Sequence, residues 1–556
     1  MDTGTKVYRN YFPIKFGWQC ACKYGLLYPV FRKLMYPGDV FKIHADLLIR
    51  YQPMLTPPMN DCTATIRFAF VPLRLIEQNT ELIVTGSVQG KLSTETIPVM
   101  DSCFKYINAS GDHKLVEKNS LLDLLYGIPA GLDLSGSGLL TKLDNSKSAP
   151  AAYYAKAYYR FWFDYYRDEN LITFNDFETY WDAVKPYLHR SDDSSLVTAA
   201  LKKDRITSSL PWQLKAVAAP TISVNGSASF TPNFPATWIQ ADNAGFTGPT
   251  IYGNQLDNDY PFLYSDNSQT LETKEAWARK TNTKIQNLLN TTQSLNITQL
   301  GFNMAQLREL SAQTRIFERL ARCGSRYTEY LHANFGVAPA DDTLQRAQYI
   351  GGFKTRIVTT EVVQTAADGS NPVGTLRGHG ITHGNSTIKP FMAKEIGVLI
   401  GIMDIKPETI YSQGVDRELT VRSRFDFLNP SFQHLSEQEV RKGEVYFDID
   451  TDSNGNLKND ETWGFQPYAQ ELRTGIKHVV GDMRDSLSYW NQSIIMSSRP
   501  SLNFAFINSW NHRTSFNRPF AVNGADAAPM IVDFGGLIEA YRPLVKNGTP
   551  GLTDHN

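Results

Sequence analysis

Residues 40–50 read VFKIHADLLIR, and their alternation is the clearest structural signal in the chain. Apolar side chains recur at every second position from Phe41 to Ile49, with Leu48 as the one break in the pattern. A period of two is typical of a β-strand with one face in a core and the other in water. A second such strand is predicted over 63–71. The proline-rich residues 51–61 between the two favour a sandwich edge over a tight hairpin.

Further strands are predicted at 354–363, 396–405, 442–449 and 501–508. The segment 396–405, IGVLIGIMDI, is apolar on both faces, which is typical of a central strand. Helices are expected as insertions between strands, one of them within 150–167, where aromatic residues crowd every face. A helix that is apolar nearly all round is usually buried on more than one side, so this one is predicted to be a core or intersubunit helix.

Composition restricts the function. The 556 residues include 55 basic and 56 acidic ones, a net charge of −1, so a basic arm that coats nucleic acid is excluded. Any contact with DNA must therefore be a local patch. Five cysteines without a CxxC pair indicate reduced thiols in a cytoplasmic setting. The N-terminus lacks a signal pattern, and no apolar run reaches the ~18 residues that a membrane span needs, so no membrane insertion is expected.

Motifs for catalysis are weak. His379 and His383 have the spacing of a zinc helix, but the glycines around them argue against a helix, and no glutamate occupies the position of the general base. They are interpreted as a pair of loop histidines. The sequence contains no nucleophile elbow, phosphate-binding loop or dinucleotide fingerprint. The chain is therefore predicted not to be an enzyme.

Residues 450–461 fit the twelve-residue calcium-loop pattern, in which oxygen donors surround a tight turn that glycine permits, here Gly455. Strand-like sequence before the loop and Trp463-Gly464 after it rule out the helix pair of an EF-hand. The alternative is a plain Asp/Asn/Gly turn between strands. Calcium is the one cofactor that the sequence suggests, with the candidate ligands Asp450, Asp452, Asn454, Asn456 and Glu461.

Residues 317–337, FERLARCGSRYTEYLHANFGV, close an amphipathic helix and then turn at Gly324 into a run rich in Arg, Tyr and His. This string resembles the GGTRY-type segment of microvirus major capsid proteins, and the likeness is nearest to the gokushovirus branch. The resemblance continues in order through the blocks PGD (37–39), PPMND (57–61), FAFVPLRL (68–75), LLDLLYGIPAG (121–131), YYRDENL (165–171), SSLPW (208–212), QRAQYIGG (345–352), YSQG (411–414), PSFQHLSEQEV (430–440) and WGFQPYAQELR (463–473).

The resemblance implies an eight-stranded antiparallel jelly roll with long helix- and loop-containing insertions. It implies one capsid domain over residues 1–556, with a surface protrusion inserted at 215–298. Copies would assemble, through pentamers, into a T=1 icosahedral shell around circular single-stranded DNA. Further partners by resemblance are an internal scaffolding protein, a pilot protein and small DNA-binding proteins, with assembly in the host cytoplasm and a final place in the virion. The alternative from another class is a carbohydrate-active β-sandwich enzyme or lectin.

Two basic patches are candidates for contact with the DNA, because phosphate attraction and base stacking both tolerate any sequence. The first combines Lys202, Lys203 and Arg205 with Trp212, and the second combines Arg473 with Lys477. The alternative is that these are ordinary solvated or interface charges.

Residues 221–271 contain no Lys, Arg or Glu, and they are too long for an ordinary connection. Aromatic residues among Asn, Thr and Asp are the composition of recognition surfaces and sugar platforms. The segment is predicted to project from the shell near the threefold axis and to contact a host receptor, a surface glycan. The alternative is a structural spacer that clamps neighbouring subunits. Its aromatic residues are Phe230, Phe234, Trp238, Phe246, Tyr252, Tyr260, Phe262 and Tyr264.

Overall fold

The computed structural model describes residues 9–85, 99–172, 174–191, 194–215, 228–229, 294–295, 304–323, 326–366, 372–432, 437–522 and 528–546. The chain divides into two units, residues 216–317 and the remainder. Within the first, strands β5 (Ala228–Ser229) and β6 (Ser294–Leu295) pair antiparallel, and helix α6 (Met304–Cys323) begins. The predicted protrusion at 215–298 covers most of this unit, and the single-domain organisation stays a prediction.

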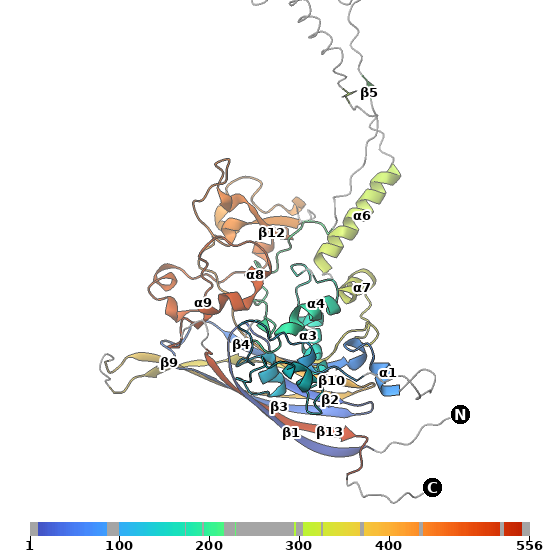
Figure 1. Ribbon diagram of the computed structural model, residues 1–556. Coiled ribbons are helices and arrows are strands. Elements are labelled where there is room, and N and C mark those ends of the chain that lie inside the picture. Colours follow the sequence, from blue (N-terminus) through green and yellow to red (C-terminus); the bar gives the residue numbers. More distant parts are fainter. Residues whose placement is uncertain are drawn as a thin grey trace, which may run out of the picture. The chain divides into compact units, whose positions relative to one another are not determined.

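Two antiparallel sheets form the centre of the larger unit (Figure 1). One has five strands, in the order β1 (Asn10–Cys22), β13 (Met530–Arg542), β3 (Val40–Tyr51), β9 (Leu376–Met392) and β8 (Thr359–Val363). The other has four, in the order β2 (Tyr28–Met35), β10 (Gly397–Pro407), β4 (Cys62–Pro72) and β7 (Gln348–Ile357).

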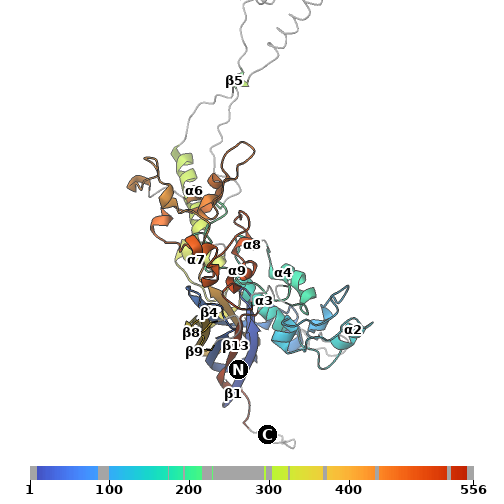
Figure 2. The same cartoon turned by 90° about the vertical axis from the view of Figure 1, so that its left-hand side faces the viewer.

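The strand pairing is nested. The first strand pairs with the last (β1 with β13), β2 pairs with β10, β3 with β9 and β4 with β7. Figure 2 shows β1 and β13 side by side. This nesting is the topology of a jelly roll, two sheets made from one folded-over hairpin. The predicted class, a mainly β protein with an antiparallel jelly roll and insertions, is confirmed. The predicted count of eight strands is not, because β8 lies as a further strand at the edge of the five-stranded sheet.

Aromatic side chains fill the space between the sheets. The ring of Phe16 on β1 packs edge-on against Phe31 on β2, with centroids 4.9 Å apart, and Phe68 on β4 lies 6.4 Å from Phe534 on β13. Gly401 on β10 lies against Phe31 and Phe68, where an added Cβ would come within 2.9 Å of both side chains. Edge-to-face packing of this kind stabilises a core beyond the area that it buries.

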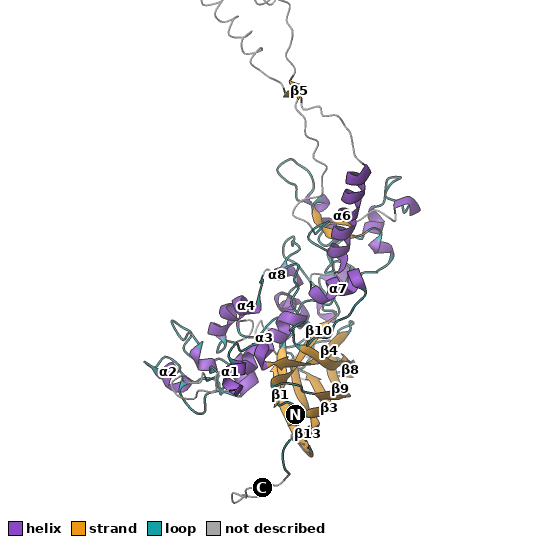
Figure 3. Ribbon diagram, turned by 90° about the vertical axis from the view of Figure 1, so that its right-hand side faces the viewer, coloured by secondary structure: helices purple, strands orange, loops and turns teal. Residues whose placement is uncertain are grey.

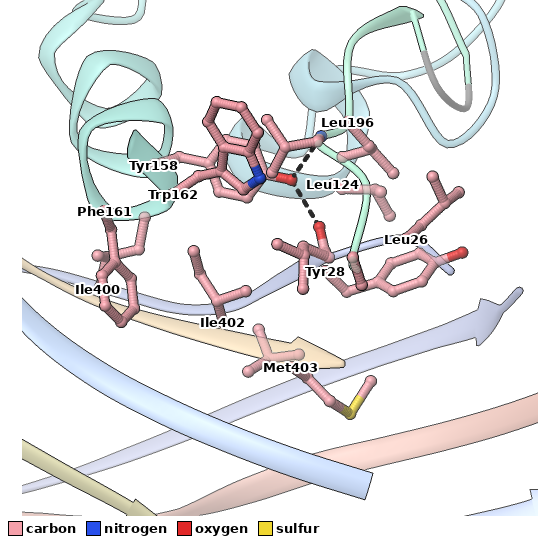
Figure 4. Close-up of a cluster of buried hydrophobic side chains, with 14 of the residues drawn as sticks. Leu26, Tyr28, Leu124, Tyr158, Phe161, Trp162, Leu196, Ile400, Ile402 and Met403 are labelled. Atoms are coloured by element: carbon pink, nitrogen blue, oxygen red, sulfur yellow. Dashed lines mark hydrogen bonds between the residues drawn. The ribbon is translucent and has the colours of Figure 1, made fainter. Parts of the chain in front are cut away.

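Helix α3 (Tyr153–Tyr165) covers the outer face of β10. Figure 4 shows Tyr158, Phe161 and Trp162 above Ile400 and Ile402, while Met403 points the other way. The Tyr158 hydroxyl donates to the Leu27 carbonyl (2.6 Å) and accepts from the Val197 amide (3.1 Å). The predicted aromatic helix is therefore present, and it is buried by its own subunit.

The remaining elements lie in two long connections. Figure 3 shows the strands gathered in one block with α3 and α4 beside it. The connection from β4 to β7 contains α1 (Thr80–Thr85), α2 (Leu139–Asp144), α4 (Phe177–Val184), α6 and α7 (Tyr327–Phe335). The connection from β10 to β13 contains β11 (Glu437–Arg441), β12 (Thr462–Pro467), α8 (Phe504–Ile507) and α9 (Arg513–Asn517).

The strand predictions are confirmed for the segments that pair with a neighbouring strand in a sheet. Strands β3, β4 and β10 match 40–50, 63–71 and 396–405, and β10 is central as expected. The predicted strand 354–363 is split at Val358 between two sheets. The strands at 442–449 and 501–508 are wrong. The first begins as a 3-10 helix and leaves Ile449 87% exposed, and the second is α8, which starts where the Asn503 side chain accepts from the Phe506 amide.

Candidate functional site: exposed surfaces of the subunit

Helix α7 carries the Arg/Tyr-rich string of the sequence, and none of its residues is buried. Tyr327 is 64% exposed and Phe335 66%, and Tyr330 and Val337 are exposed beside them. The Tyr327 and Tyr330 rings are stacked, with centroids 6.3 Å apart, and Phe335 meets Tyr330 edge-on at 6.2 Å. We call Tyr327, Tyr330, Phe335 and Val337 the α7 face.

Polar contacts hold the start of α7 in place. The Arg326 guanidinium donates to the Glu169 carboxylate (3.1 Å) and to the Arg167 carbonyl (3.0 Å). The Glu329 carboxylate accepts from the Arg326 amide at 3.1 Å, as in a capping box. Gly336 ends the helix in the left-handed conformation, with φ at +68°. The α7 face is therefore presented by a helix whose first turn is tied to the subunit and whose last turn is capped at Gly336.

A groove of about 360 Å³ lies between the 417–428 segment and the β11 and β12 region. Its lining includes Phe425, which is 71% exposed, and Phe427, which is 62% exposed, together with Leu428, Tyr468 and Leu472. We call these five residues and the space between them the Phe425 groove. No local sequence pattern signals the groove, because its lining comes from three separate segments, 417–428, 438–441 and 468–472.

The first basic patch is broken up by the fold. Arg205 is 3% exposed, and its guanidinium donates to the buried Glu444 carboxylate at 2.7 Å. Arg205 is therefore a structural charge of the subunit, and its burial argues against the predicted contact with DNA. Lys202 is exposed, and exposed Lys203 pairs with Asp168 at 2.8 Å. Trp212 is half-buried, and its indole nitrogen has no hydrogen-bond partner among the described residues.

The second patch stays at the surface. Arg473 is exposed, and Lys477 pairs with the Glu408 carboxylate at 3.1 Å. Exposed ion pairs of this kind contribute little to stability and remain accessible to a partner.

The candidate calcium loop is a closed turn. The Asp452 carboxylate accepts from the Asn454 and Asn456 amides, both at 2.8 Å, and these hydrogen bonds, that of Asn456 first, lower the pKa of Asp452. Lys442 donates to Glu461 at 2.6 Å, which lowers the pKa of Glu461. Across the described ranges, no three His, Cys, Asp or Glu side chains are grouped so that they could hold a metal ion. Calcium stays a prediction.

The other sequence candidates are placed as follows. His379 and His383 lie exposed on one face of strand β9, not in a loop. The four cysteines whose side chains are described, Cys20, Cys22, Cys62 and Cys103, are free thiols. The eight aromatic residues predicted to contact a receptor, from Phe230 to Tyr264, lie outside the described residues.

Within the described part of the chain, no helix is both long and apolar enough to cross a bilayer. The sequence profile of the family described as "Capsid protein (F protein)" matches residues 2–113 and 129–552.

Individual relatives cover nearly the whole chain. The chain is 26% identical over 597 residues to the capsid protein VP1 of Chlamydia phage 1, covering 98% of this chain and 96% of the relative. It is 27% identical over 572 residues to the capsid protein VP1 of Bdellovibrio phage phiMH2K, covering 98% and 95%. To the capsid protein VP1 of Spiroplasma virus 4 it is 25% identical over 564 residues, covering 96% and 93%.

Proposed function

We propose, from the premise that the chain belongs to the capsid protein (F protein) family, that its copies close into a T=1 icosahedral shell around a circular single-stranded DNA genome. The nested jelly roll carries this proposal, because two packed sheets make a stiff unit whose connections are free to form contacts with neighbours.

The match over residues 2–113 and 129–552 shows the family directly. The chain is a microvirus major capsid protein, as the sequence resemblance predicted, and a structural component of a bacteriophage virion that self-assembles. The alternative of a carbohydrate-active enzyme or lectin gives way to this structural role.

The genome contact is proposed for the exposed basic residues. Lys202, Lys203 and Arg473 remain accessible on the subunit, and Lys477 is held only by an exposed ion pair. With a net charge of −1, the protein has to meet phosphate groups through such local patches. Arg205 is excluded from this set because its charge is neutralised inside the fold.

Residues 221–271 are proposed to meet the host surface, a glycan, for the compositional reasons given above. Pentamers as intermediates, an internal scaffolding protein, a pilot protein, small DNA-binding proteins and assembly in the host cytoplasm are proposed from the family. Deleting 225–265 should leave shells that form but adsorb poorly to host cells. Normal infection by such particles would refute the receptor role, and failure to form particles would favour the spacer.

A second proposal is that residues 450–461 bind calcium. The alternative is a plain turn that the hydrogen bonds of Asp452 close without a metal ion. Calorimetry of the purified protein with added calcium, compared with an Asp450→Asn variant, separates the two. Heat of binding that the variant abolishes supports calcium, and absence of binding heat from the unmodified protein supports the plain turn.

The central test is assembly. The purified protein should form uniform closed particles in negative-stain images, and co-expression with phage DNA should yield particles that protect the DNA from nuclease. Stable monomers that never assemble under any condition that supports related phages would refute the proposed shell.

A further inference from the structure

We propose that the α7 face of one subunit packs into the Phe425 groove of a second copy, as a head-to-tail contact of the shell. The inference rests on the proposed assembly and deepens it by naming the two surfaces that meet.

The α7 face has the properties of an interface anchor. Tyrosine and phenylalanine supply large rigid areas, and binding is strongest where such residues are held in place before the partner arrives. Tyr327 and Phe335 are about two-thirds exposed, although Arg326 and Glu329 fix the start of the helix. The fold therefore orders an aromatic surface that its own subunit leaves uncovered.

The Phe425 groove is the complementary surface. It is a hollow of about 360 Å³, at the low end of the about 300–1,000 Å³ usual for binding pockets, and its lining is apolar at Phe425, Phe427, Leu428 and Leu472. Arg417, one of the lining residues, donates to the Glu439 carbonyl at 2.6 Å, so this part of the lining is ordered. Charged residues also line the hollow, namely Arg417, Glu418, Asp426, Arg441 and Glu471. The exposed rings of Phe425 and Phe427 give an incoming aromatic side chain apolar surface to pack against.

Several observations point to a second copy as the partner. The chain belongs to a family of proteins that build shells from copies of themselves, and every copy carries both the protruding face and the hollow. Two different surfaces on one chain make a heterologous contact, which closes into a ring when the rotation between copies allows it.

Cross-linking tests the contact directly. Subunits with Phe335→Cys and subunits with Phe427→Cys are purified separately, mixed one to one and assembled together, then treated with a short bis-maleimide. We expect a covalent dimer in the mixture at least tenfold above the level in either single-variant particle. A mixture of Val99→Cys with Ile449→Cys, two residues that are 86% and 87% exposed, is the matched control and should stay at background.

The outcomes are separable. Cross-links in particles of Phe335→Cys alone would mean that two α7 faces meet each other, which overturns the proposal. Particles that form normally but give only background cross-linking overturn it too, while the shell itself stands. Absence of particles from the unmodified chain is instead a failure of the proposed function.

A second measurement covers variants that assemble poorly. The double variant Tyr327→Ala/Phe335→Ala should lower particle yield at least tenfold and leave the unfolding midpoint of the unassembled subunit unchanged. Tyr327→Phe should keep a normal yield. A lowered midpoint in the double variant would show that the face is covered within its own subunit, which contradicts the proposal.

Discussion

Helices α3 and α7 are both rich in aromatic residues, yet the fold uses them in opposite ways. In α3, Tyr158, Phe161 and Trp162 are buried between the sheet and α4, and Trp162 stacks on Tyr180 at 4.8 Å. In α7 no residue is buried, and Tyr327 and Tyr330 stack on each other in solvent. Aromatic content alone therefore does not tell a core helix from a presented one.

The charged neighbours account for the difference. The charges of α3 are neutralised by ion pairs within the subunit. Buried Lys156 pairs with Glu77 at 2.9 Å, and Arg160 pairs with Asp164 at 2.9 Å. The charges at α7 cluster at its first turn and tie only that end to the subunit. A helix fixed at one end by polar contacts keeps its apolar side free for a partner.

The largest effect is expected from truncating one aromatic residue in each helix. Phe161→Ala should cost about 3–5 kcal/mol of unfolding free energy, because the fully buried ring leaves a cavity above the sheet. Phe335→Ala should change it by less than about 0.5 kcal/mol, because its ring is mostly in water already. Denaturant unfolding of the unassembled subunit gives both values, and equal losses would erase the contrast between the helices.

Removing one hydroxyl group sharpens the comparison. Tyr158→Phe leaves the Leu27 carbonyl and the Val197 amide without their partner in a buried site, and we expect a loss of about 1–3 kcal/mol. Tyr330→Phe, at an exposed position, is the matched control and should be neutral. If Tyr158→Phe were neutral as well, the α3 layer would be held by packing alone.

Acidification should lower the free energy of unfolding, because two histidines are buried. Burial lowers the pKa of His189 and of His512 below the ordinary 6.5, so the folded state keeps both rings neutral. The contribution of the neutral histidines to the free energy of unfolding is complete above about pH 6.5 and is lost as the pH falls towards the folded pKa. The loss is at most about 1.4 kcal/mol per pH unit for each histidine. Unfolding midpoints from pH 8 to pH 5 measure the slope.

Substituting His512 by Gln should reduce that slope, and substituting His332 on exposed α7 by Gln should leave it unchanged. An identical slope in all three proteins would place the pH dependence elsewhere.

The smallest effect concerns the start of α7. Arg326→Lys keeps the charge but loses the fork that reaches both Glu169 and the Arg167 carbonyl, and we expect about 0.5–1 kcal/mol of local stability to be lost. Hydrogen exchange of the α7 amides should speed up while the sheet amides stay protected. Unchanged exchange would mean that packing, and not Arg326, orders the helix.

Sequence patterns predicted the sheets well and the surfaces poorly, for physical reasons. Alternation at 40–50 and the two-sided apolar run at 396–405 report burial directly, so β3 and β10 were predictable. The same alternation at 442–449 misled, because no neighbouring strand is there to pair with it. Pairing depends on residues far away in the chain, which a local pattern does not contain.

The candidate sites show the same limit. Arg205 sits in a run that looks solvated, but it is buried in ion pairs with Glu444 and Asp416, both more than two hundred residues later in the chain. The string containing α7 stood out in the sequence, but the contact that fixes its start joins Arg326 to Glu169, which lies far away in the chain. The Phe425 groove has no sequence signal at all, because its two walls come from separate segments.

The nested strand order also sets a schedule for the newly made chain. Strand β13 lies between β1 and β3, so these two early strands lack their shared neighbour until residue 542 has left the ribosome. Contacts between such distant segments form late in folding. A chain that stops short of residue 530 therefore keeps two open strand edges where the finished subunit has one continuous sheet. The five-stranded sheet is therefore complete only after synthesis ends, and only a chain that includes β13 can assemble with its neighbours.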